Sequence, residues 1–564
     1  MASPRARLFL LMTLALAALS PVARAADFYV DPASGDIGND GSAGSPWSTL
    51  QEVIENDLIE THTWAQLPYD AGSQLVRENA GAPVKAGDTI WLRSGYHGEI
   101  TIQRWYNADF ITIAAQEGHS PEASSVLLQA VGKWILRGLS VSPTYAATYG
   151  CGELVTVGSH NYSGPAREVV IEDFEIFSVR DTAAWTIGDW NDLPCNGIGV
   201  SGDDVVVRNN RLLNVKFGIS VSGQRALVEH NVVENFAGDG MRGLGDHGTF
   251  QYNTVKNCYD VNDNHDDGFQ SWSTGEGGVG TGEVVGITLR GNTIINYEDP
   301  AQPFRGPLQG IGCFDGMFVD WVVENNVIMV DHWHGITLLG ARDSRIVNNT
   351  VVDLNDVDPG PPWVRIGTHK NGTASSGCVV RNNLTTAVSV DADQDVTVDS
   401  NIIVGDYADH FVDYAGLDLH LIADSAAVNT GAAALAPAID RDGIPRPQGD
   451  EVDVGAYEYF VDDPAWPDGG AVDVVRPDAA EADVAEPDAA EPDVGGADAG
   501  GTDGETTDGG VTPVDSGAQT GGGDGGEGEV VAEGCACAAP TGVDEACLLL
   551  VGALGLMAWR RQRR

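Results

Sequence analysis

The 564-residue chain carries 82 acidic residues against 31 basic ones, which gives a formal net charge of −51 and a pI near 4.2. This charge repels phosphate backbones and anionic lipid headgroups, so we expect no nucleic-acid partner and no membrane contact by the main body. Abundant Gly, Asp and Asn with little Lys suit a turn-rich extracellular β protein. The many carboxylates fit either calcium binding or simple solubility.

The first 25 residues show the three zones of a secretory signal peptide. Arg5 and Arg7 precede an apolar run from Leu8 to Leu19, and the small residues around Ala25 predict cleavage after that position. Export permits disulfides. The number of cysteines before the C-terminal tail is odd, so at least one should be free or paired between molecules: Cys151, Cys195, Cys258, Cys313 and Cys378.

One unit recurs through the middle of the chain: two or three β-forming residues, a polar residue, Asn, and then another apolar alternation. The closest copies lie 21 to 23 residues apart. The recurring asparagines are Asn210, Asn231, Asn253, Asn292, Asn326, Asn349 and Asn383. A second marker, Gly followed by an apolar residue, recurs in phase at Gly197, Gly218, Gly240, Gly268, Gly310 and Gly335. The two markers predict an all-β solenoid whose coils stack at roughly 4.8 Å, with the asparagines in a hydrogen-bonded ladder.

These repeats resemble right-handed parallel β-helix proteins of the pectate-lyase-like superfamily. Residues 27–32 and 45–51 resemble the N-terminal opening segment of that family, residues 86–96 its first coil, and residues 440–446 and 454–459 a frequent closing segment. The resemblance implies an opening segment and first coil at 26–105 and a right-handed parallel β-helix at 106–460. It also implies an extracellular polysaccharide as partner.

The interval from the repeated Asn to the following Gly shows where coils carry extra sequence. It is 8 or 9 residues in three coils, but 15 from Asn253 to Gly268 and 18 from Asn292 to Gly310. Because consecutive coils stack, the two insertions should lie side by side. They are expected to wall a cleft over the strands that begin at the Gly markers.

Three aspartates at this turn are candidate metal ligands. Asp239 and Asp267 each precede a Gly marker on consecutive coils, which predicts carboxylates roughly 5 Å apart, and Asp266 lies beside them. Such clustering favours a cation or a raised pKa. The alternative for Asp239 alone is an Asp–Gly turn in which the carboxylate binds its own backbone.

In the lyases that the repeats resemble, Ca²⁺ and basic side chains neutralise a uronate carboxylate, and Lys or Arg removes the C5 proton before β-elimination. The resemblance implies Arg242 or Lys216 as base and His265 as acid or base. Asp239, Asp266 and Asp267 would be Ca²⁺ ligands. Strand alternation and neighbouring position predict four substrate-binding side chains: Gln270, Trp272, Arg305 and His334.

Other interpretations remain open. His332 and His334 alternate on one strand and with His265 suggest a transition-metal site. The leading hypothesis is a surface-anchored, Ca²⁺-assisted lyase that cleaves a uronic-acid polymer. A glycoside hydrolase would use two carboxylates from among Asp239, Asp267 and Glu298. A carbohydrate-binding adhesin without turnover is the third possibility. Four tryptophans are candidates to stack on sugar rings: Trp185, Trp190, Trp272 and Trp333.

Two further segments follow the repeats. Residues 461–533 contain almost no large apolar side chains and are predicted to be a disordered linker. Residues 534–564 carry Cys535-Ala-Cys537, a short apolar run and an arginine cluster. This order resembles the C-terminal sorting tails of myxobacterial surface proteins, which implies processing near Cys535 by sorting machinery and anchoring at the cell surface or outer membrane. The alternative is an ordinary short membrane anchor, although the apolar run is short for a transmembrane helix. We expect a monomer.

Overall fold

The structure is a computed structural model, and it describes residues 25–460. The predicted signal peptide, apart from its last residue, lies outside these residues, as do the predicted linker and sorting tail. In residues 25–460 no helix combines the length and apolar character that a membrane crossing requires.

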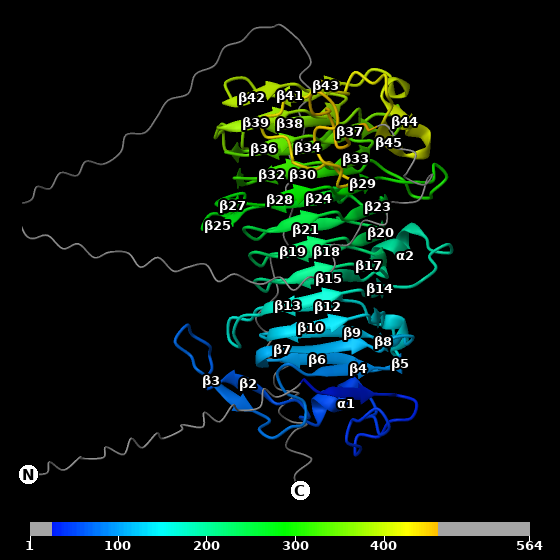
Figure 1. The fold of residues 1–564 in the computed structure, drawn as a ribbon, viewed down its shortest axis with the longest axis vertical. Coiled ribbons are helices and arrows are strands. Elements are labelled where there is room, and N and C mark those ends of the chain that lie inside the picture. The colour runs from blue at the N-terminus through cyan, green and yellow to red at the C-terminus, as the bar shows by residue number, and fades with distance from the viewer. Residues whose placement is uncertain (1–24, 461–564) are drawn as a thin grey trace, which may run out of the picture. The chain divides into compact units, whose positions relative to one another are not determined.

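Three parallel sheets wind through the chain, and successive coils add a strand to each in turn (Figure 1). Sheet 1 contains β1 (Asp27–Val30), β4 (Thr89–Leu92), β7 (Tyr106–Ala115), β10 (Gly132–Arg137), β13 (Arg167–Glu172), β16 (Val206–Arg208), β19 (Leu227–Glu229), β22 (Thr249–Gln251), β28 (Thr288–Arg290), β32 (Val322–Glu324), β36 (Arg345–Val347), β39 (Cys378–Arg381) and β42 (Val396–Asp399), with the antiparallel pair β2 (Thr61–Trp64) and β3 (Leu75–Glu78) at its edge. Sheet 2 contains β5 (Gly95–Tyr96), β8 (Pro121–Ala123), β11 (Ser140–Val141), β14 (Glu175–Phe177), β17 (Arg211–Val215), β20 (Val232–Phe236), β23 (Thr254–Cys258), β29 (Thr293–Ile295), β33 (Val327–Val330), β37 (Thr350–Asp353), β40 (Leu384–Thr385) and β43 (Ile402–Ile403). Sheet 3 contains β6 (Glu99–Gln103), β9 (Ser125–Gln129), β12 (Glu153–Gly158), β15 (Asn196–Val200), β18 (Ile219–Val221), β21 (Met241–Gly243), β24 (Asp267–Trp272), β30 (Gln309–Asp315), β34 (His334–Leu339), β38 (Trp363–Gly367) and β41 (Val388–Val390).

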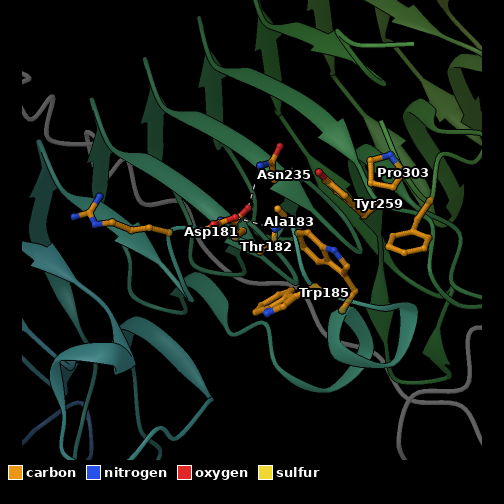
Figure 2. A pocket seen from close by; sticks show the side chains of 11 residues that line it. Asp181, Thr182, Ala183, Trp185, Asn235, Tyr259 and Pro303 are labelled. Atoms are coloured by element: carbon orange, nitrogen blue, oxygen red, sulfur yellow. Dashed lines mark hydrogen bonds between the residues drawn. The ribbon is translucent and has the colours of Figure 1, made fainter. Parts of the chain in front are cut away.

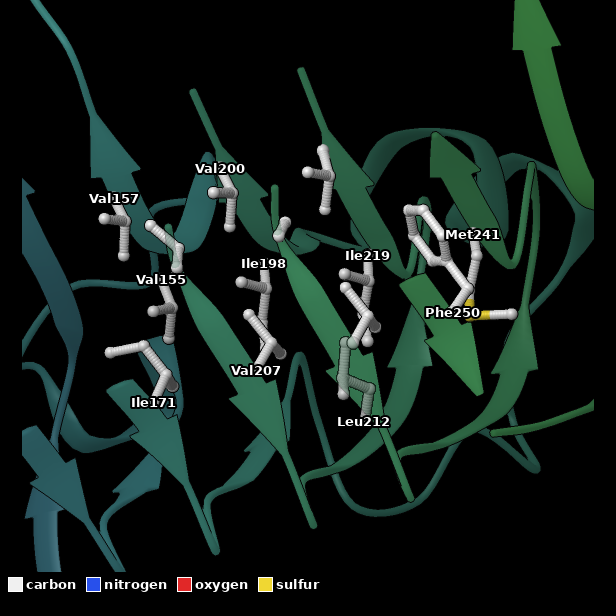
Figure 3. Close-up of a cluster of buried hydrophobic side chains, with 14 of the residues drawn as sticks. Val155, Val157, Ile171, Ile198, Val200, Val207, Leu212, Ile219, Met241 and Phe250 are labelled. Carbon is white, nitrogen blue, oxygen red and sulfur yellow. The ribbon is translucent and has the colours of Figure 1, made fainter. Parts of the chain in front are cut away.

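The core fills the bore between the sheets. In sheet 3, Ile198, Ile219, Met241 and Phe269 pair in register on consecutive strands, and all are buried. Figure 3 shows the first three stacked beside side chains from the other two sheets. Because the Gly markers begin these strands, one apolar residue after each Gly always points inward.

The predicted asparagine ladder is confirmed. It lies at the turn between sheet 1 and sheet 2, where the Nδ2 of each asparagine donates to the Oδ1 of the next at 2.9 to 3.0 Å. The ladder extends one step further than the repeat pattern predicts, from Asn383 to Asn401. Each Nδ2 also donates to a backbone carbonyl of the sheet 1 strands, as in the 2.8 Å bond from Asn231 to Val207 O. The buried turn is thereby satisfied without water.

Insertions border sheet 3 on both sides. Between sheet 2 and sheet 3 lie residues 178–195, which contain α2 (Ile187–Asp192), and residues 259–266, 296–308 and 354–362. After sheet 3 come a hairpin of β25 (Thr274–Gly275) and β26 (Gly278–Val279) and a side sheet of β27 (Glu283–Val285), β31 (Met317–Val319) and β35 (Ala341–Arg342). The face of sheet 3 therefore lies between two sets of loops.

Chain from outside the repeats covers the N-terminal end of the coil stack and, after residue 404, the outer face of the last sheet 2 strands. At the N-terminal end α1 (Leu50–Glu55), capped by Thr49, buries Leu50 and Val53 against the core. Near the C-terminus β44 (Phe411–Asp413) pairs with β45 (Asp418–Leu421), and the chain then runs past the turns that follow sheet 1, where Asn348 Nδ2 donates to Asp453 O at 3.0 Å.

The cysteine prediction is confirmed for the described residues. Cys151 and Cys195 form a disulfide, which ties the α2 insertion to the preceding coil. Cys258, Cys313 and Cys378 are free and buried.

Candidate functional site

The outward side chains of sheet 3 form one row across consecutive coils. Strand register aligns Arg242, Gln270, Gly312, Thr337 and Arg365. We call these five residues the sheet 3 row. They face outward because their strand neighbours on both sides fill the bore.

A second column lies just before the Gly markers and supports the row. In three coils the residue three positions earlier touches its row member: Asp239 Oδ2 lies 2.5 Å from Arg242 Nε, Gln270 Nε2 donates to Asp267 Oδ2 at 2.8 Å, and His334 Nδ1 lies 2.9 Å from Thr337 Oγ1. Each coil thus uses the same local contact with different chemistry. Because the coils stack, the same contact between residues three positions apart recurs on successive strands as a ladder of polar pairs.

Asp239 and Asp267 are adjacent and completely buried. The backbone N–H of Asp267 donates to Asp239 Oδ1 at 3.2 Å. Burial raises the pKa of Asp239, while the Arg242 guanidinium opposes that rise. Burial, reinforced by the charge of Asp239, raises the pKa of Asp267 well above its ordinary value. We therefore assign the negative charge to Asp239, against Arg242, and a proton to Asp267.

Asp266 completes the acid cluster, which we define as Asp239, Asp266 and Asp267. Its Oδ1 accepts a 2.8 Å hydrogen bond from Asn264 Nδ2, and the Cys258 thiol lies 3.4 Å from Oδ2. Burial raises the pKa of Asp266 to about 7, helped by the charge of Asp239. Burial also raises the pKa of Cys258 well above its ordinary value, so the thiol keeps its proton and donates it.

Gly312 leaves a notch in the sheet 3 row. A Cβ on Gly312 would lie only 2.0 Å from Asp267 Oδ1, so the carboxyl occupies the space of a missing side chain. That oxygen is buried and has no hydrogen-bond partner among residues 25–460, and the same holds for Oε1 of Gln309 on the neighbouring strand. An unpartnered buried carboxyl oxygen is stable only when it is uncharged, which agrees with a protonated Asp267.

Arg242 lies between two aromatic rings. Its guanidinium carbon is 3.9 Å from the centroid of Phe217 and 5.5 Å from that of Trp272. The side chain is 20% exposed, so one edge of the guanidinium faces the loop-bordered surface. A fixed and partly desolvated arginine binds a planar carboxylate more strongly than a mobile one.

Three histidines lie on the same face as this arginine. His332 and His334 stack with ring centroids 5.1 Å apart, and His334 also packs against Phe314 and Trp363. Burial lowers the pKa of His332 to about 4 and that of His334 to about 3, so both are neutral at pH 7. The exposed His265 interacts electrostatically with both histidines and with Asp239.

Two of the predicted site residues, Lys216 and Arg305, make no direct contact with the sheet 3 row or the acid cluster among the described residues. Lys216 Nζ is 3.5 Å from Asn191 O, in the α2 insertion, although its neighbour Phe217 touches Arg242. Arg305 is exposed, lies over the ring of Tyr297 at 4.7 Å and donates to Gln302 O. The remaining predicted residues are placed in the sheet 3 row, in the acid cluster, or beside them. Their functional roles stay predictions.

The acid cluster lacks the open oxygens that a calcium site needs. A calcium ion needs several open, ionised oxygens, but all three carboxyls are buried and already bonded to Arg242, Gln270 or Asn264. Within residues 25–460, no group of three or more His, Cys, Asp or Glu side chains is arranged to hold a metal ion. As arranged, these residues do not fit calcium, and the three histidines do not form a transition-metal site.

A pocket of about 520 Å³ lies on the other side of the insertions and was not predicted as a site (Figure 2). The α2 insertion forms one wall, and loops 259–266 and 296–308 supply Tyr259 and Phe304. The sequence did not reveal the α2 insertion, because its coil has Asp173 and Phe174 at the position of the ladder Asn. Without that Asn, the Asn-to-Gly spacing that marks the other insertions is undefined. The tryptophans Trp185 and Trp190 were the available signal, and both line this pocket.

Comparison with known proteins bears on the fold. A family model described as the right-handed beta helix region matches residues 196–358. No curated protein matches the chain. Structural neighbours on this fold include polysaccharide lyases, epimerases and glycoside hydrolases.

Three solved structures illustrate the likeness. The pectate lyase Pel9A is 14% identical, with 78% of this chain and 98% of that chain covered and a TM-score of 0.37. A complex of XylC with xylose is 9% identical, with 77% and 98% covered and a TM-score of 0.47. The A-module of the Azotobacter vinelandii mannuronan C-5 epimerase AlgE4 is 14% identical, with 56% and 91% covered and a TM-score of 0.32. With the strand order above, the family-model match identifies the described body as a right-handed parallel β-helix.

Proposed function

We propose that the protein is a polysaccharide lyase that cleaves a uronic-acid-containing polymer on the loop-bordered face of sheet 3. The observation that carries this proposal is Arg242, which is held by the buried Asp239 and packed between Phe217 and Trp272. β-Elimination next to a carboxylate requires a cation that neutralises it, and Arg242 is the cation best placed for this role.

We assign Arg242 to carboxylate binding and not to proton abstraction. An arginine keeps its proton in proteins, and Arg242 is engaged in an ion pair with Asp239. Arg365, which belongs to the same row four strands along and is paired with Asp391, supplies a second positive group for a uronate further along the polymer. The row would therefore bind a chain of uronates that lies across the coils.

His265 is proposed as the group that moves protons. It is exposed on the insertion beside Asp266 and interacts electrostatically with Asp239, whereas His332 and His334 are half-buried and hold their protons weakly. In the reaction the base takes the C5 proton, the electron pair forms the C4–C5 double bond, and the C4–O bond to the leaving sugar breaks. The leaving oxygen, which stays on C1 of the released sugar, then takes a proton. One fragment therefore carries an unsaturated uronate at its non-reducing end, and the other carries a new reducing end.

The test is the ultraviolet absorbance of unsaturated uronates while the full-length protein is incubated with pectic, alginate and glycosaminoglycan polymers. Arg242→Gln should reduce turnover by about 100-fold or more, because the developing charge loses its neutralising group, and should spare much of the polymer binding. Arg225→Gln is the matched control, because Arg225 pairs with Asp204 on an exposed turn outside this face.

The other outcomes discriminate between the alternatives. New reducing ends without unsaturated product would replace the lyase by a glycoside hydrolase, and Asp239 and Asp267 would then be the carboxylates to test. Polymer binding without turnover would favour an adhesin.

Calcium and location are separate parts of this proposal. The same assay with added Ca²⁺ and with a chelator tests the predicted metal requirement, for which the acid cluster offers no open ligand set. Export and surface anchoring, predicted from the two ends of the chain, are tested by cell fractionation.

A further inference from the structure

The pocket behind the insertions is separate from the sheet 3 row. Asn214 of β17 and Asn235 of β20, both sheet 2 strands, line it together with the α2 insertion (Figure 2). In Figure 1, α2 lies beside these two strands. We propose that this pocket binds a single uncharged sugar ring. The proposal goes beyond the lyase activity, because it concerns a ligand held away from Arg242 and does not require turnover.

The walls have the aromatic character that sugar rings need. Trp190 is buried and stacked on Tyr259, with ring centroids 4.1 Å apart at an angle of 20°. Trp185 stands nearly perpendicular to Trp190, at 5.0 Å and 84°, and remains half-buried. The stacked rings of Trp190 and Tyr259 therefore form a fixed wall of the pocket, and the half-buried Trp185 is the ring available to stack on a ligand. Aromatic faces pack well against the C–H faces of pyranoses.

The α2 insertion that carries both tryptophans is fixed in place. Thr186 caps α2 through a reciprocal capping box with Asp189. Asn191 Nδ2 donates to Val261 O at 2.9 Å, which fastens the helix to the next insertion. A pre-formed wall loses little entropy when a ligand binds.

The polar groups are amides whose direction is set by the fold. Asn214 and Asn235 have φ of 55° and 58°, a left-handed conformation that asparagine tolerates better than other side chains. Asn214 Nδ2 donates to Val179 O at 2.7 Å, and Asn235 Nδ2 donates to Asn214 Oδ1 at 3.0 Å. Among the described residues no donor reaches Asn235 Oδ1, so this oxygen can accept a hydrogen bond from a sugar hydroxyl.

The charges of the pocket select against uronates. Arg180 is the one cation in its lining, and both of its terminal nitrogens are bonded to Glu175, at 2.6 and 2.8 Å. Asp181 adds a negative charge, and its Oδ1 is engaged by Ala183 N at 2.9 Å while the exposed carboxylate stays open to ligand hydroxyls. The net charge of these three groups is −1, which repels a sugar carboxylate and accepts neutral hydroxyls.

The size is that of a site for a small ligand. Ligand pockets commonly measure about 300 to 1,000 Å³, and 520 Å³ lies in the lower half of that range. The loop 259–266 contributes Tyr259 to the pocket and Asp266 to the acid cluster. A neutral side branch or terminal sugar could therefore be held next to a uronate backbone on sheet 3.

The experiment is saturation-transfer NMR with the full-length protein and the methyl glycosides of glucose, galactose, xylose, rhamnose and N-acetylglucosamine, compared with those of glucuronic and galacturonic acid. At least one neutral glycoside should bind, and the two uronic acids should bind at least tenfold more weakly. Trp185→Ala should weaken the neutral ligand at least tenfold, and Trp185→Phe should restore most of the affinity because it returns an aromatic face.

Asn235→Gly provides a second variant that does not disturb α2, since glycine keeps the positive φ while the amide is lost. It should weaken binding at least threefold. Tyr162→Ala is the control, because Tyr162 is 54% exposed and does not line the pocket. Stronger binding of uronic acids, binding by no neutral glycoside, or full affinity in both pocket variants would overturn the proposal. None of these results depends on a lyase assay, so failure of the proposed activity is distinguishable from failure of this site.

Discussion

Asp266 shows how a single buried carboxyl can make this fold sensitive to pH. Its ordinary pKa of 3.8 rises to about 7 in the folded protein, chiefly because of burial. Between these two values the folded state binds a proton that the unfolded state has already released. The free energy of unfolding therefore falls as pH rises from about 4 to 7 and is then constant.

Asp266→Asn should remove this dependence, because an amide can accept the Asn264 hydrogen bond without ever ionising. Relative to the natural protein, the variant should gain about 3 kcal/mol of stability between pH 5 and pH 8, from 1.36 kcal/mol for each unit of pKa between 5 and 7. Urea denaturation at both pH values measures the difference.

Asp263→Asn is the control for this measurement. Asp263 lies in the same insertion but is exposed, so its replacement should change stability equally at pH 5 and pH 8. If Asp266→Asn behaves in the same way, the acid cluster ionises normally and its assigned protonation is wrong.

At the scale of single elements, the repeats were predictable because each marker has a physical reason to recur. The ladder Asn satisfies buried backbone carbonyls, and the Gly leaves room for the next coil, as at Gly240, whose Cβ would lie 2.3 Å from Val255 Cγ1. The contacts of the site were not predictable in this way. A sequence shows that Arg242 follows Asp239 by three residues, but not that Phe217 from the preceding coil packs on its guanidinium.

The ladder itself gives a prediction about stability. Asn253→Ala would remove the 2.9 Å hydrogen bond to Val228 O and the 3.0 Å bond that Asn253 Oδ1 accepts from the backbone N–H of Asn231. It would also remove one of the two hydrogen bonds of the buried Asn231 side-chain amide, which keeps its bond to Val207 O. We expect a loss of about 3 kcal/mol or more in the free energy of unfolding, measured by urea denaturation.

Asn401→Ala is the matched comparison at the end of the ladder. Asn401 is half-buried and donates only to the carbonyls of Val380 and Asp399, so water can replace part of its bonding. Its loss should cost clearly less than that of Asn253. Equal losses would mean that the ladder does not derive its stability from burial.

At the scale of the whole described body, a second core explains why the coils need a closing segment. Outward side chains on the last sheet 2 strands are apolar, including Val327, Met329 and Val352, and would lie in water if nothing covered them. Residues 404–456 bury them, with Val454 and Ala456 completing the cluster. The family resemblance predicts a closing segment at 454–459. It does not predict that this segment packs on sheet 2, because the repeat pattern predicts that outward side chains on these strands face solvent.

A buried ion pair fastens this segment. Arg446 and Glu458 have fully buried side chains, and Arg446 Nη1 lies 2.7 Å from Glu458 Oε2. Arg446 Nη2 also donates to Gly455 O at 2.9 Å. Asn325, in the turn after β32, donates from its Nδ2 to the carbonyl oxygen of Ile439. The cost of desolvating two charges offsets much of their attraction, so the intact pair adds little net stability. Removing only one partner is strongly destabilising, because it leaves the other charge buried and unpaired.

Arg446→Met should therefore cost about 3 to 5 kcal/mol, because it leaves the Glu458 carboxylate buried without its cation. The double variant Arg446→Met/Glu458→Leu should recover a large part of this loss, since two apolar side chains can replace the pair. Urea denaturation of both single variants and the double variant gives the coupling energy. Arg225→Met, which breaks an exposed pair with Asp204, should cost less than about 1 kcal/mol. A double variant as unstable as the sum of its singles would show that Arg446 acts through its backbone contacts, and that the closing segment is held by hydrogen bonds and not by charge.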